Sequence, residues 1–357
     1  MLPETLIVAP ITQQTWEAAQ AELGEAWRSL QAAHAGIARQ VPFERVLMAE
    51  RRCTDILHVW FSDAFQLEFV EAPRLVLSLD VDGVLEDDRE GFSSTNVAGA
   101  AALRLLGLGG VAVLLNTARS LPEVISRVER FKLLGGVAGF GANVWDAVYG
   151  REYYLLSDVG AAQIDRLRAI LRRDSGSLLD ASYACSLRAS RMTDGRLRPI
   201  VGEEARKLLD RGGLTDLTFW VAPRHTDFVD RSVDKGRGIE RLVLELGLQR
   251  LPLAAMGDAG CDLPMLKAAD FAFLPAATLP SYVSTRRQRL MRSRHLGGQA
   301  LWEAACQLVP SSSLQRQVMD RLQGLRLPDW MPESLRTPPP LNRGLFPRLA
   351  TALTTRR

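Results

Sequence analysis

The sequence predicts an α/β fold, in which helices cover a parallel sheet, because short apolar runs alternate with longer amphipathic stretches from Leu75 onward. The apolar runs are short enough to be buried strands: Leu75–Leu79, Val111–Leu115, Val137–Phe140, Leu253–Met256 and Phe271–Leu274. Helical periodicity marks the stretches between them: Val97–Leu106, Leu121–Leu134, Gly238–Leu246 and Leu263–Ala269. Right-handed crossovers would bring the carboxyl ends of these strands to one edge of the sheet.

The alternation breaks between about Tyr149 and Val229, which indicates an inserted α+β domain. Within it we expect a helix at Ile164–Leu171 and strands at Tyr183–Met192 and Leu217–Val221. The predicted organisation is therefore an N-terminal extension, a core in two parts, the inserted domain and a C-terminal segment: residues 1–73, 74–148 with 230–296, 149–229 and 297–357.

The two flanking segments carry weaker patterns. The N-terminal extension contains one expected helix, Thr15–Ala38, and an apolar run, Ile56–Phe61, and it is consistent with a small extra domain. After the core we expect a helix at Gln299–Leu308. Pro310 and the run Pro338–Pro340 then favour an extended or poorly ordered tail.

Composition places the chain among ordinary soluble proteins: it has 357 residues, of which 47% are hydrophobic and 24% charged. The four cysteines form no CxxC pair, so a zinc site is not indicated and a reduced cytoplasm fits best. The start of the chain, Met1–Glu4, lacks the features of a secretory signal. The stretch Val97–Leu115 is interrupted by an arginine and glycines, so a membrane span is not indicated.

Charge is unevenly distributed, although the formal net charge is only +3. The segment Ser281–Arg357 holds 13 arginines and four acids, so the tail is a separate basic segment. Such a tail would suit nucleic acid or an acidic partner, but a solvated arginine-rich surface is the simpler interpretation. We therefore do not favour a nucleic-acid partner, and the oligomeric state is left open.

The strongest motif is an apolar strand that ends in two carboxylates, Asp80 and Asp82, followed at once by Gly83. Positions i and i+2 of an extended strand point to the same side, so both carboxylates would face one site at the carboxyl end of the sheet. Two like charges so close need neutralising, and Mg²⁺ does this with oxygen ligands. The alternative is a simple Asp-Gly turn after a strand.

A second apolar strand, Leu253–Met256, also runs into acids, in the order Gly257, Asp258 and, four residues later, Asp262. Asp258 would complete a metal shell at the strand end. Asp262 precedes Leu263 and Pro264, so it can cap the following helix, reach the cation, or do both.

Two further elements suit a phosphate group. Thr117 and Ala118 follow the strand Val111–Leu115 and present a hydroxyl and backbone N–H groups where a helix begins near Leu121, although such residues are more often plain helix caps. Lys235 is one of only four lysines among 44 basic residues, which favours a compact point charge on a phosphoryl group over a surface lysine.

These four elements, in this order, resemble the haloacid dehalogenase (HAD) superfamily of phosphatases. The motifs are DxDGV at Asp80–Val84, a strand followed by Thr117, Lys235-Gly236, and GDxxxD ending at Asp262. The resemblance covers roughly residues 75–280 and implies a Rossmann-like core. An insert between the second and third motifs is similar to the C2-type cap of the Cof-like sugar phosphatases, which include sucrose-phosphate phosphatase.

The resemblance implies a Mg²⁺-dependent phosphomonoester hydrolase that acts on a small phosphorylated metabolite, with a sugar phosphate favoured. Asp80 would attack phosphorus to give an aspartyl-phosphate, and Asp82 would act as general acid and then general base. Crowding by the other acids would keep a proton on Asp82. Lys235, Thr117 and Ala118 would bind phosphoryl oxygens. The expected ligands of the ion are four residues: Asp80, Asp82 through its backbone carbonyl, Asp258 and Asp262.

Residues of the cap are expected to select the substrate. The polar candidates are Arg188, Arg191, Arg224, His225 and Asp227 in the cap, with Asn143 in the core as a weaker candidate. The motifs leave two alternatives open. One is phosphotransfer from the aspartyl-phosphate to an alcohol instead of water. The other is a non-catalytic phosphate-binding or signalling module, against which Asp82 and the pair Asp258 and Asp262 argue, since signalling receivers lack them.

Overall fold

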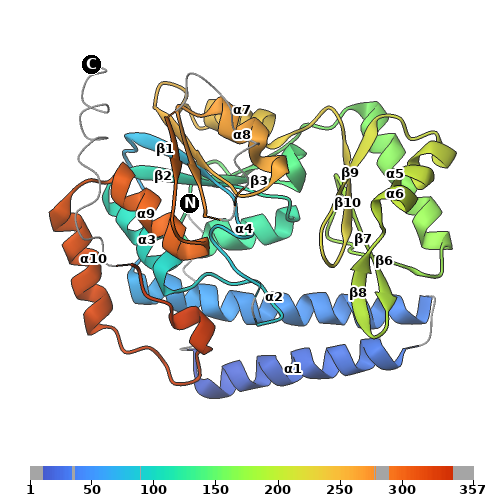
Figure 1. Ribbon diagram of the computed structural model, residues 1–357, viewed down its shortest axis with the longest axis horizontal. Coiled ribbons are helices and arrows are strands. Elements are labelled where there is room, and N and C mark those ends of the chain that lie inside the picture. Colours follow the sequence, from blue (N-terminus) through green and yellow to red (C-terminus); the bar gives the residue numbers. More distant parts are fainter. Residues whose placement is uncertain (1–10, 34–36, 89, 277, 279–288, 341–357) are drawn as a thin grey trace.

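The protein is described by a computed structural model that covers residues 11–33, 37–88, 90–276, 278 and 289–340. An eight-stranded main sheet forms its centre, in the order β13-β12-β11-β1-β2-β3-β4-β5 (Figure 1). The strands span β1 Leu75–Leu79, β2 Val111–Asn116, β3 Gly135–Ala138, β4 Asn143–Asp146, β5 Arg151–Tyr154, β11 Leu253–Met256, β12 Phe271–Leu274 and β13 Arg289–Arg292. Neighbours from β13 to β3 pair in parallel, and β4 and β5 continue antiparallel.

Both faces of the sheet are covered, as the continuous apolar strands require. Alternate residues of β1 enter different cores: Leu77 packs on the side of α3, α4 and α9, whereas Val76 packs on the side of α7 and α8. The helices span α3 Val97–Leu108, α4 Leu121–Arg130, α7 Lys235–Glu245, α8 Leu263–Ala268 and α9 Gly297–Leu308. The α/β fold class and the parallel arrangement predicted from the sequence are therefore confirmed.

A second, antiparallel sheet lies in the inserted part of the chain, in the order β6-β7-β10-β9 with β8 paired to β7. Its elements are α5 Asp158–Arg173, β6 Ser177–Leu179, β7 Leu187–Thr193, β8 Arg196–Pro199, α6 Gly202–Gly212, β9 Leu217–Val221 and β10 Thr226–Asp230. This unit has a hydrophobic core of its own. We call it the cap. Strand β5 pairs into the main sheet, so the cap begins after Tyr154 and not at residue 149.

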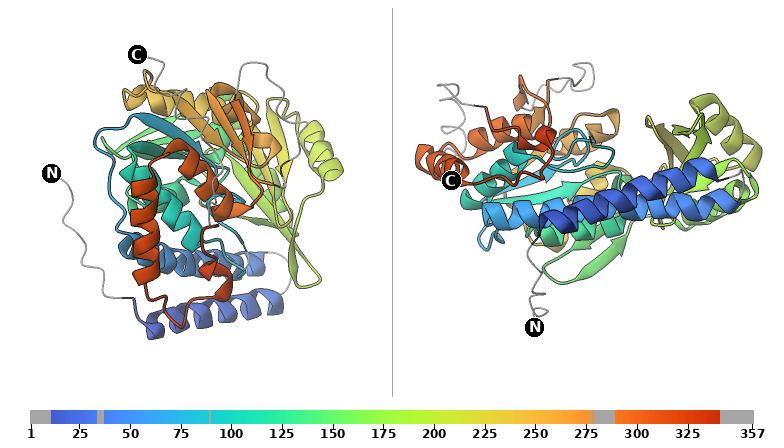
Figure 2. Two further views of the ribbon diagram at one scale, coloured as in Figure 1. Left: turned by 60° about the vertical axis from the view of Figure 1, so that its left-hand side comes forward. Right: turned by 90° about the horizontal axis from the view of Figure 1, so that it is seen from below.

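The N-terminal extension is a helical hairpin of α1 (Gln13–Ala32) and α2 (Ile37–Phe65). The expected helix Thr15–Ala38 was wrong at its end, because the chain turns extended at Ala33 and a second helix follows. The apolar run Ile56–Phe61 lies within α2. Buried side chains of both helices share one core with the main sheet, so the hairpin is not a separate domain. It runs beneath both the core and the cap (Figures 1 and 2).

The C-terminal segment differs from the expected extended tail. After α9 the chain forms another helix, α10 (Ser312–Gly324), which begins where Ser311 accepts a hydrogen bond from the Leu314 N–H. Val318 of α10 is buried in the main core. The sequence 325–340 is irregular apart from a short 3₁₀ turn, Glu333–Arg336, and the rest of the basic tail lies outside the described residues.

Some predicted boundaries shift by a few residues. Helix α4 stops at Arg130 and not at Leu134, and Lys132 adopts a positive φ of 57° directly after it. Strand β3 starts two residues earlier than expected, and β7 occupies only the second half of the expected strand Tyr183–Met192. Among the described helices, none combines the length and hydrophobicity that a membrane crossing requires.

Candidate active site

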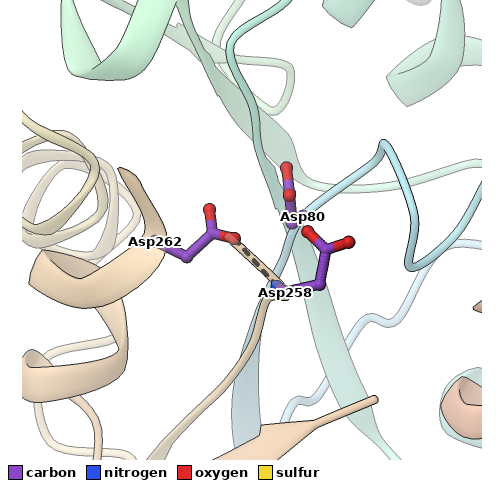
Figure 3. A group of neighbouring side chains, drawn as sticks. All are labelled: Asp80, Asp258 and Asp262. Atoms are coloured by element: carbon purple, nitrogen blue, oxygen red, sulfur yellow. Dashed lines mark hydrogen bonds between the residues drawn. The ribbon is translucent and has the colours of Figure 1, made fainter. Parts of the chain in front are cut away.

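Three carboxylates converge at the carboxyl edge of the main sheet. Asp80 follows β1 and Asp258 follows β11, its parallel neighbour, while Asp262 lies in the turn before α8. One carboxylate oxygen from each residue lies within 4.8 Å of the others, and Figure 3 shows the three side chains around a common space. The sequence prediction that strand ends would bring these acids together is thus met by the structure.

Lys235, the first residue of α7, lies between two of these acids. Its ammonium nitrogen is 2.8 Å from Oδ1 of Asp80 and 2.5 Å from Oδ1 of Asp262. The lysine side chain is 1% exposed, and both acids are buried with it. A buried ammonium is stable here because two carboxylates compensate for its lost hydration.

Both carboxylate oxygens of Asp262 accept hydrogen bonds from protein groups. Its Oδ1 accepts from Lys235, and its Oδ2 accepts from the backbone N–H groups of Asp258 and Ala259, each at 2.9 Å. The side chain makes no capping bond to α8, contrary to one of the two roles we considered for it. Asp262 therefore orients the loop that carries Asp258 and fixes the lysine.

Glycine is required at Gly83 for the acids to approach. Gly83 has a φ of 77°, and a Cβ built there would lie 2.2 Å from Oδ2 of Asp258. Gly257 has a similar role, since its Cβ would lie 2.6 Å from the carboxyl group of Asp262. The glycines that flank the acids in the two motifs thus leave room for carboxylates.

The electrostatics of the cluster favour a bound cation. Burial, followed by the charge of Asp262, raises the pKa of Asp80, although Lys235 acts against both. The same two causes raise the pKa of Asp258 to about 6. The cluster offers only oxygen donors, and a divalent cation would keep both acids ionised. Because both oxygens of Asp262 are engaged, Asp80 and Asp258 are the side chains that fit Mg²⁺ best.

Asp82 lies apart from the other acids and faces a guanidinium. Arg119 donates to Asp82 through Nε at 3.1 Å and Nη2 at 2.5 Å, and through Nη1 to Glu123 at 2.8 Å. The side chain of Asp82 is 52% exposed. Asp82 therefore forms an ion pair in addition to the expected charge interaction with Asp80 and Asp258. The sequence analysis gave Arg119 no role; the available signal was its place directly after Thr117 and Ala118, with Glu123 four residues later.

The segment after β2 takes the place predicted for a phosphate-binding element. Leu79 and Leu115 are register partners, so Thr117 follows its strand beside Asp80. Thr117 is buried, its hydroxyl accepts from the Arg119 N–H at 3.2 Å, and Ala118 lines a cavity above the strand ends. Helix α4 begins at Leu121, where Ser120 and Glu123 form a capping box.

A cavity of about 570 Å³ lies between the core, the cap and α2, and it contains Asp82 at its core end. This volume is in the range of small-molecule sites. The cap contributes Arg188, His225 and Asp227, among other residues, to its wall. Arg188 donates twice to Asp227, at 2.7 and 2.9 Å, and His225 lies 3.4 Å from the same carboxylate.

Two of the predicted substrate residues lie elsewhere. The Asn143 side chain donates to Glu152 and to the sulfur of Cys185, both at 3.2 Å, and does not line the cavity. Arg191 pairs with Asp174 and with Glu204 in the cap, also away from the cavity. Neither position could be excluded from sequence alone, because the direction in which a side chain points depends on strand register, in the main sheet for Asn143 and in the cap sheet for Arg191.

An aromatic contact joins the core to the cap at the cavity wall. Phe140 stacks on Trp220 of β9, with ring centroids 6.3 Å apart and an interplanar angle of 9°. Phe140 has a positive φ of 62°, which is rare for an aromatic residue and places its ring toward the cap. Sequence reasoning did not single out either residue, since an aromatic residue in a strand is ordinarily part of a core.

The family comparison agrees with this geometry. Residues 206–274, which include Lys235, Asp258 and Asp262, match the model of the haloacid dehalogenase-like hydrolases. Over these residues the chain is similar to that family. The match agrees with the class of enzyme expected from the motifs, a hydrolase of the HAD type. No curated protein sequence matches the chain.

Solved structures are similar to this chain in fold. A protein of Thermoplasma acidophilum is 16% identical with a TM-score of 0.52, and the match covers 67% of this chain and 99% of that one. The sucrose-phosphatase of Synechocystis in complex with sucrose and phosphate is 15% identical, with a TM-score of 0.47 and coverage of 66% and 98%. The C-terminal domain of a C. albicans trehalose-6-phosphate phosphatase is 14% identical, with a TM-score of 0.49 and coverage of 71% and 96%.

Proposed function

We propose that the chain is a Mg²⁺-dependent phosphomonoester hydrolase that forms an aspartyl-phosphate on Asp80. The observation that carries this proposal is the contact of Asp80 with Lys235 beside Asp258. Asp82 and Ala259, which follow these acids in sequence, line a cavity of substrate size. A nucleophilic carboxylate, a fixed cation and a further acid at one strand edge are the parts that phosphoryl transfer needs.

Two half-reactions follow from the positions of the acids. An oxygen of Asp80 attacks phosphorus, the bond to the leaving alkoxide breaks, and Asp82 transfers a proton to that alkoxide. Asp82 then removes a proton from water, which attacks the phosphorus of the aspartyl-phosphate and releases phosphate. Arg119 holds the half-exposed Asp82 at the core end of the cavity, where a leaving group would enter.

Asp80 and Asp258 are the residues that would hold Mg²⁺, with the backbone carbonyl of Asp82 as the further ligand that the resemblance implies. The ion would neutralise charge on the phosphoryl oxygens. Lys235 stabilises that charge from the other side of Asp80, and the N–H groups at Thr117 and Ala118 are proposed to bind the remaining oxygens.

The charge of the cavity supports a neutral, hydroxylated leaving group such as a sugar. Each arginine in its wall is paired with a carboxylate, as Arg188 is with Asp227 and Arg224 with Glu50. A second anionic group would have to disrupt one of these pairs. Hydroxyl groups can instead bond to both partners, and Phe140 and Trp220 offer an apolar face.

Phosphate release tests the proposal. Wild-type protein is assayed with p-nitrophenyl phosphate and a panel of sugar phosphates, first with Mg²⁺, then with EDTA, then after Mg²⁺ is restored. We expect turnover that EDTA removes reversibly. Addition of alcohols separates hydrolysis from transfer, because a phosphorylated alcohol would appear in place of phosphate. Absence of turnover on every ester would instead favour a binding module.

The cysteines support a reducing compartment, and we place the enzyme in the cytoplasm on this basis. No disulfide joins the cysteines in the part of the chain that the structure describes. Cys53 is buried, and burial raises the pKa of its thiol to about 11, which disfavours the reactive thiolate.

A further inference from the structure

We infer that helix α2 of the N-terminal hairpin forms one wall of the active-site cavity and selects substrates by the size and polarity of the leaving group. This inference rests on the proposed function. Phe43, Leu47, Glu50 and Arg51 of α2 line the cavity that contains Asp82. They form the hairpin side of the cavity, so a leaving group that fills the cavity beyond Asp82 would contact them. The hairpin thereby contributes to the substrate site although it belongs to neither the core sheet nor the cap.

Contacts with the core fix the position of this wall. The Thr54 hydroxyl donates to the Ser93 carbonyl at 2.6 Å, and Asp55 accepts from the Ser126 hydroxyl at 2.7 Å. One turn further along, Nε2 of the fully buried His58 lies 3.1 Å from Oε1 of Glu86. Glu86 follows closely on the catalytic segment, so α2 is held at a constant distance from the reacting groups.

Contacts with the cap hold the other half of α2. The side-chain amide of Gln40 makes two bonds to the backbone of Leu179 in the edge strand β6, at 2.6 and 3.1 Å. Arg51 donates to Asp180 at 3.3 Å and to the Ser182 hydroxyl at 2.7 Å. Because α2 binds core and cap alike, the cavity has a closed end whose shape depends on α2.

Arg224 joins the cap to α2 and to the core at the closed end of the cavity, and we call this group of contacts the junction. Arg224 lies in the turn between β9 and β10 of the cap and donates to Glu50 of α2 at 2.7 Å and to Asp88 of the core at 3.4 Å. Its guanidinium also lies 5.6 Å from the ring centroid of Trp27 in α1. The junction presents a carboxylate and a guanidinium side by side, which suits hydroxyl groups, while Leu47 and Phe43 offer apolar contact.

A larger side chain at position 47 tests whether α2 limits the size of the leaving group. We compare Leu47→Trp with Met48→Trp, its neighbour on α2, which is 66% exposed and serves as the control. The esters are p-nitrophenyl phosphate, glucose 6-phosphate and trehalose 6-phosphate. Leu47→Trp is expected to lower kcat/KM for the disaccharide ester by about tenfold or more through KM, since a filled pocket rejects the longer group. The loss on p-nitrophenyl phosphate should be several-fold smaller than the loss on the disaccharide ester, and all activities of Met48→Trp should stay within about twofold of wild type.

The second test replaces a charged residue of the Arg224 junction with a neutral one and measures KM. Glu50→Gln keeps the shape of the junction and should raise KM for the sugar esters by a larger factor than KM for p-nitrophenyl phosphate. Equal losses on every ester, or none, would overturn the inference and leave the proposed function in place. Wild-type turnover of p-nitrophenyl phosphate but of no sugar ester would overturn it as well. Complete inactivity of the wild-type protein would overturn the proposed function and the inference together.

Discussion

The ammonium of Lys235 lies 2.8 Å from the carboxylate of Asp80, although 155 residues separate the two in sequence. Both side chains are buried, and Asp262 completes the group on the other side of the lysine. The pair thus joins the start of α7 to the end of β1 and sets the charge of the site. Its energetic role can be measured separately from catalysis.

Lys235→Met is expected to destabilise the protein by about 3–5 kcal/mol, because it leaves buried carboxylates without their cation. Urea unfolding in EDTA measures this loss, and Mg²⁺ should reduce it by supplying positive charge to the same acids. Lys207→Met is the control, since Lys207 is exposed and pairs with Glu203 on the surface of α6. Its effect should be below about 1 kcal/mol. Equal stability of Lys235→Met and wild type in EDTA would contradict the buried ion pair.

Gly83→Ala should weaken activation by Mg²⁺. The added Cβ would overlap Oδ2 of Asp258, and the positive φ adds strain of about 1–3 kcal/mol. Gly91→Ala is a matched control, because Gly91 has a φ of 79° with nothing within 4 Å of its Cβ position. Titration of activity with Mg²⁺ should show a higher half-saturating concentration for Gly83→Ala only. The same shift in both variants would mean that backbone strain, and not displacement of Asp258, is responsible.

Asp82→Asn should lower kcat/KM more for alkyl phosphates than for p-nitrophenyl phosphate. An alkoxide needs a proton to leave, whereas p-nitrophenolate leaves readily without one. Glucose 6-phosphate and p-nitrophenyl phosphate are compared by phosphate release, and the ratio of the two losses reports the acid role. The same loss on both esters would contradict that role.

Arg119→Lys should reproduce this pattern in a weaker form. Lysine keeps the charge but lacks the fork that binds Asp82 and Glu123 together. We expect a loss in kcat/KM for the alkyl ester of about tenfold. Glu123→Gln, which retains a hydrogen-bond acceptor for Arg119, should cost less. Unchanged kinetics of Arg119→Lys would show that Arg119 does not position the acid.

The free energy of unfolding should decrease as pH falls below 6.5, the ordinary pKa of histidine, because of His58. Burial lowers the pKa of His58 below the ordinary value of 6.5, and the charge of Glu86 only partly opposes this. Below pH 6.5 the unfolded chain binds a proton at His58 that the folded chain resists, so the free energy of unfolding decreases with pH. Urea unfolding of His58→Gln should show a shallower decrease than the wild type, and His295→Gln, at a partly exposed histidine, serves as the control. Parallel curves for His58→Gln and wild type would rule out this linkage.

The sheet and its acids could be predicted because local patterns determine them. A buried parallel strand is a short apolar run, and its carboxyl end is where the next polar residue lies, so Asp80 and Asp258 could be assigned to one edge. The glycines next to these acids could be identified from the same two motifs. The pairing of Lys235 with both acids follows once α7 is placed against that edge.

The hairpin and the cavity could not be predicted, because their contacts are tertiary. Helix α2 contains Pro42 near its start and a mixed pattern, so only its apolar run stood out. The orientation of Arg188 toward the cavity and of Arg191 away from it depends on the register of β7 with β10. Helix α10 was obscured by nearby prolines, although Ser311 marked its start.

The nucleophile is tested most directly by phosphate release from p-nitrophenyl phosphate by Asp80→Asn in Mg²⁺. The amide preserves the shape of Asp80 but cannot attack phosphorus, so we predict a loss of at least about a thousandfold in kcat. Circular dichroism of the same sample should show an intact fold. Turnover by Asp80→Asn near the wild-type rate, in protein of verified mass, would contradict the assignment of Asp80 as the group that accepts the phosphoryl.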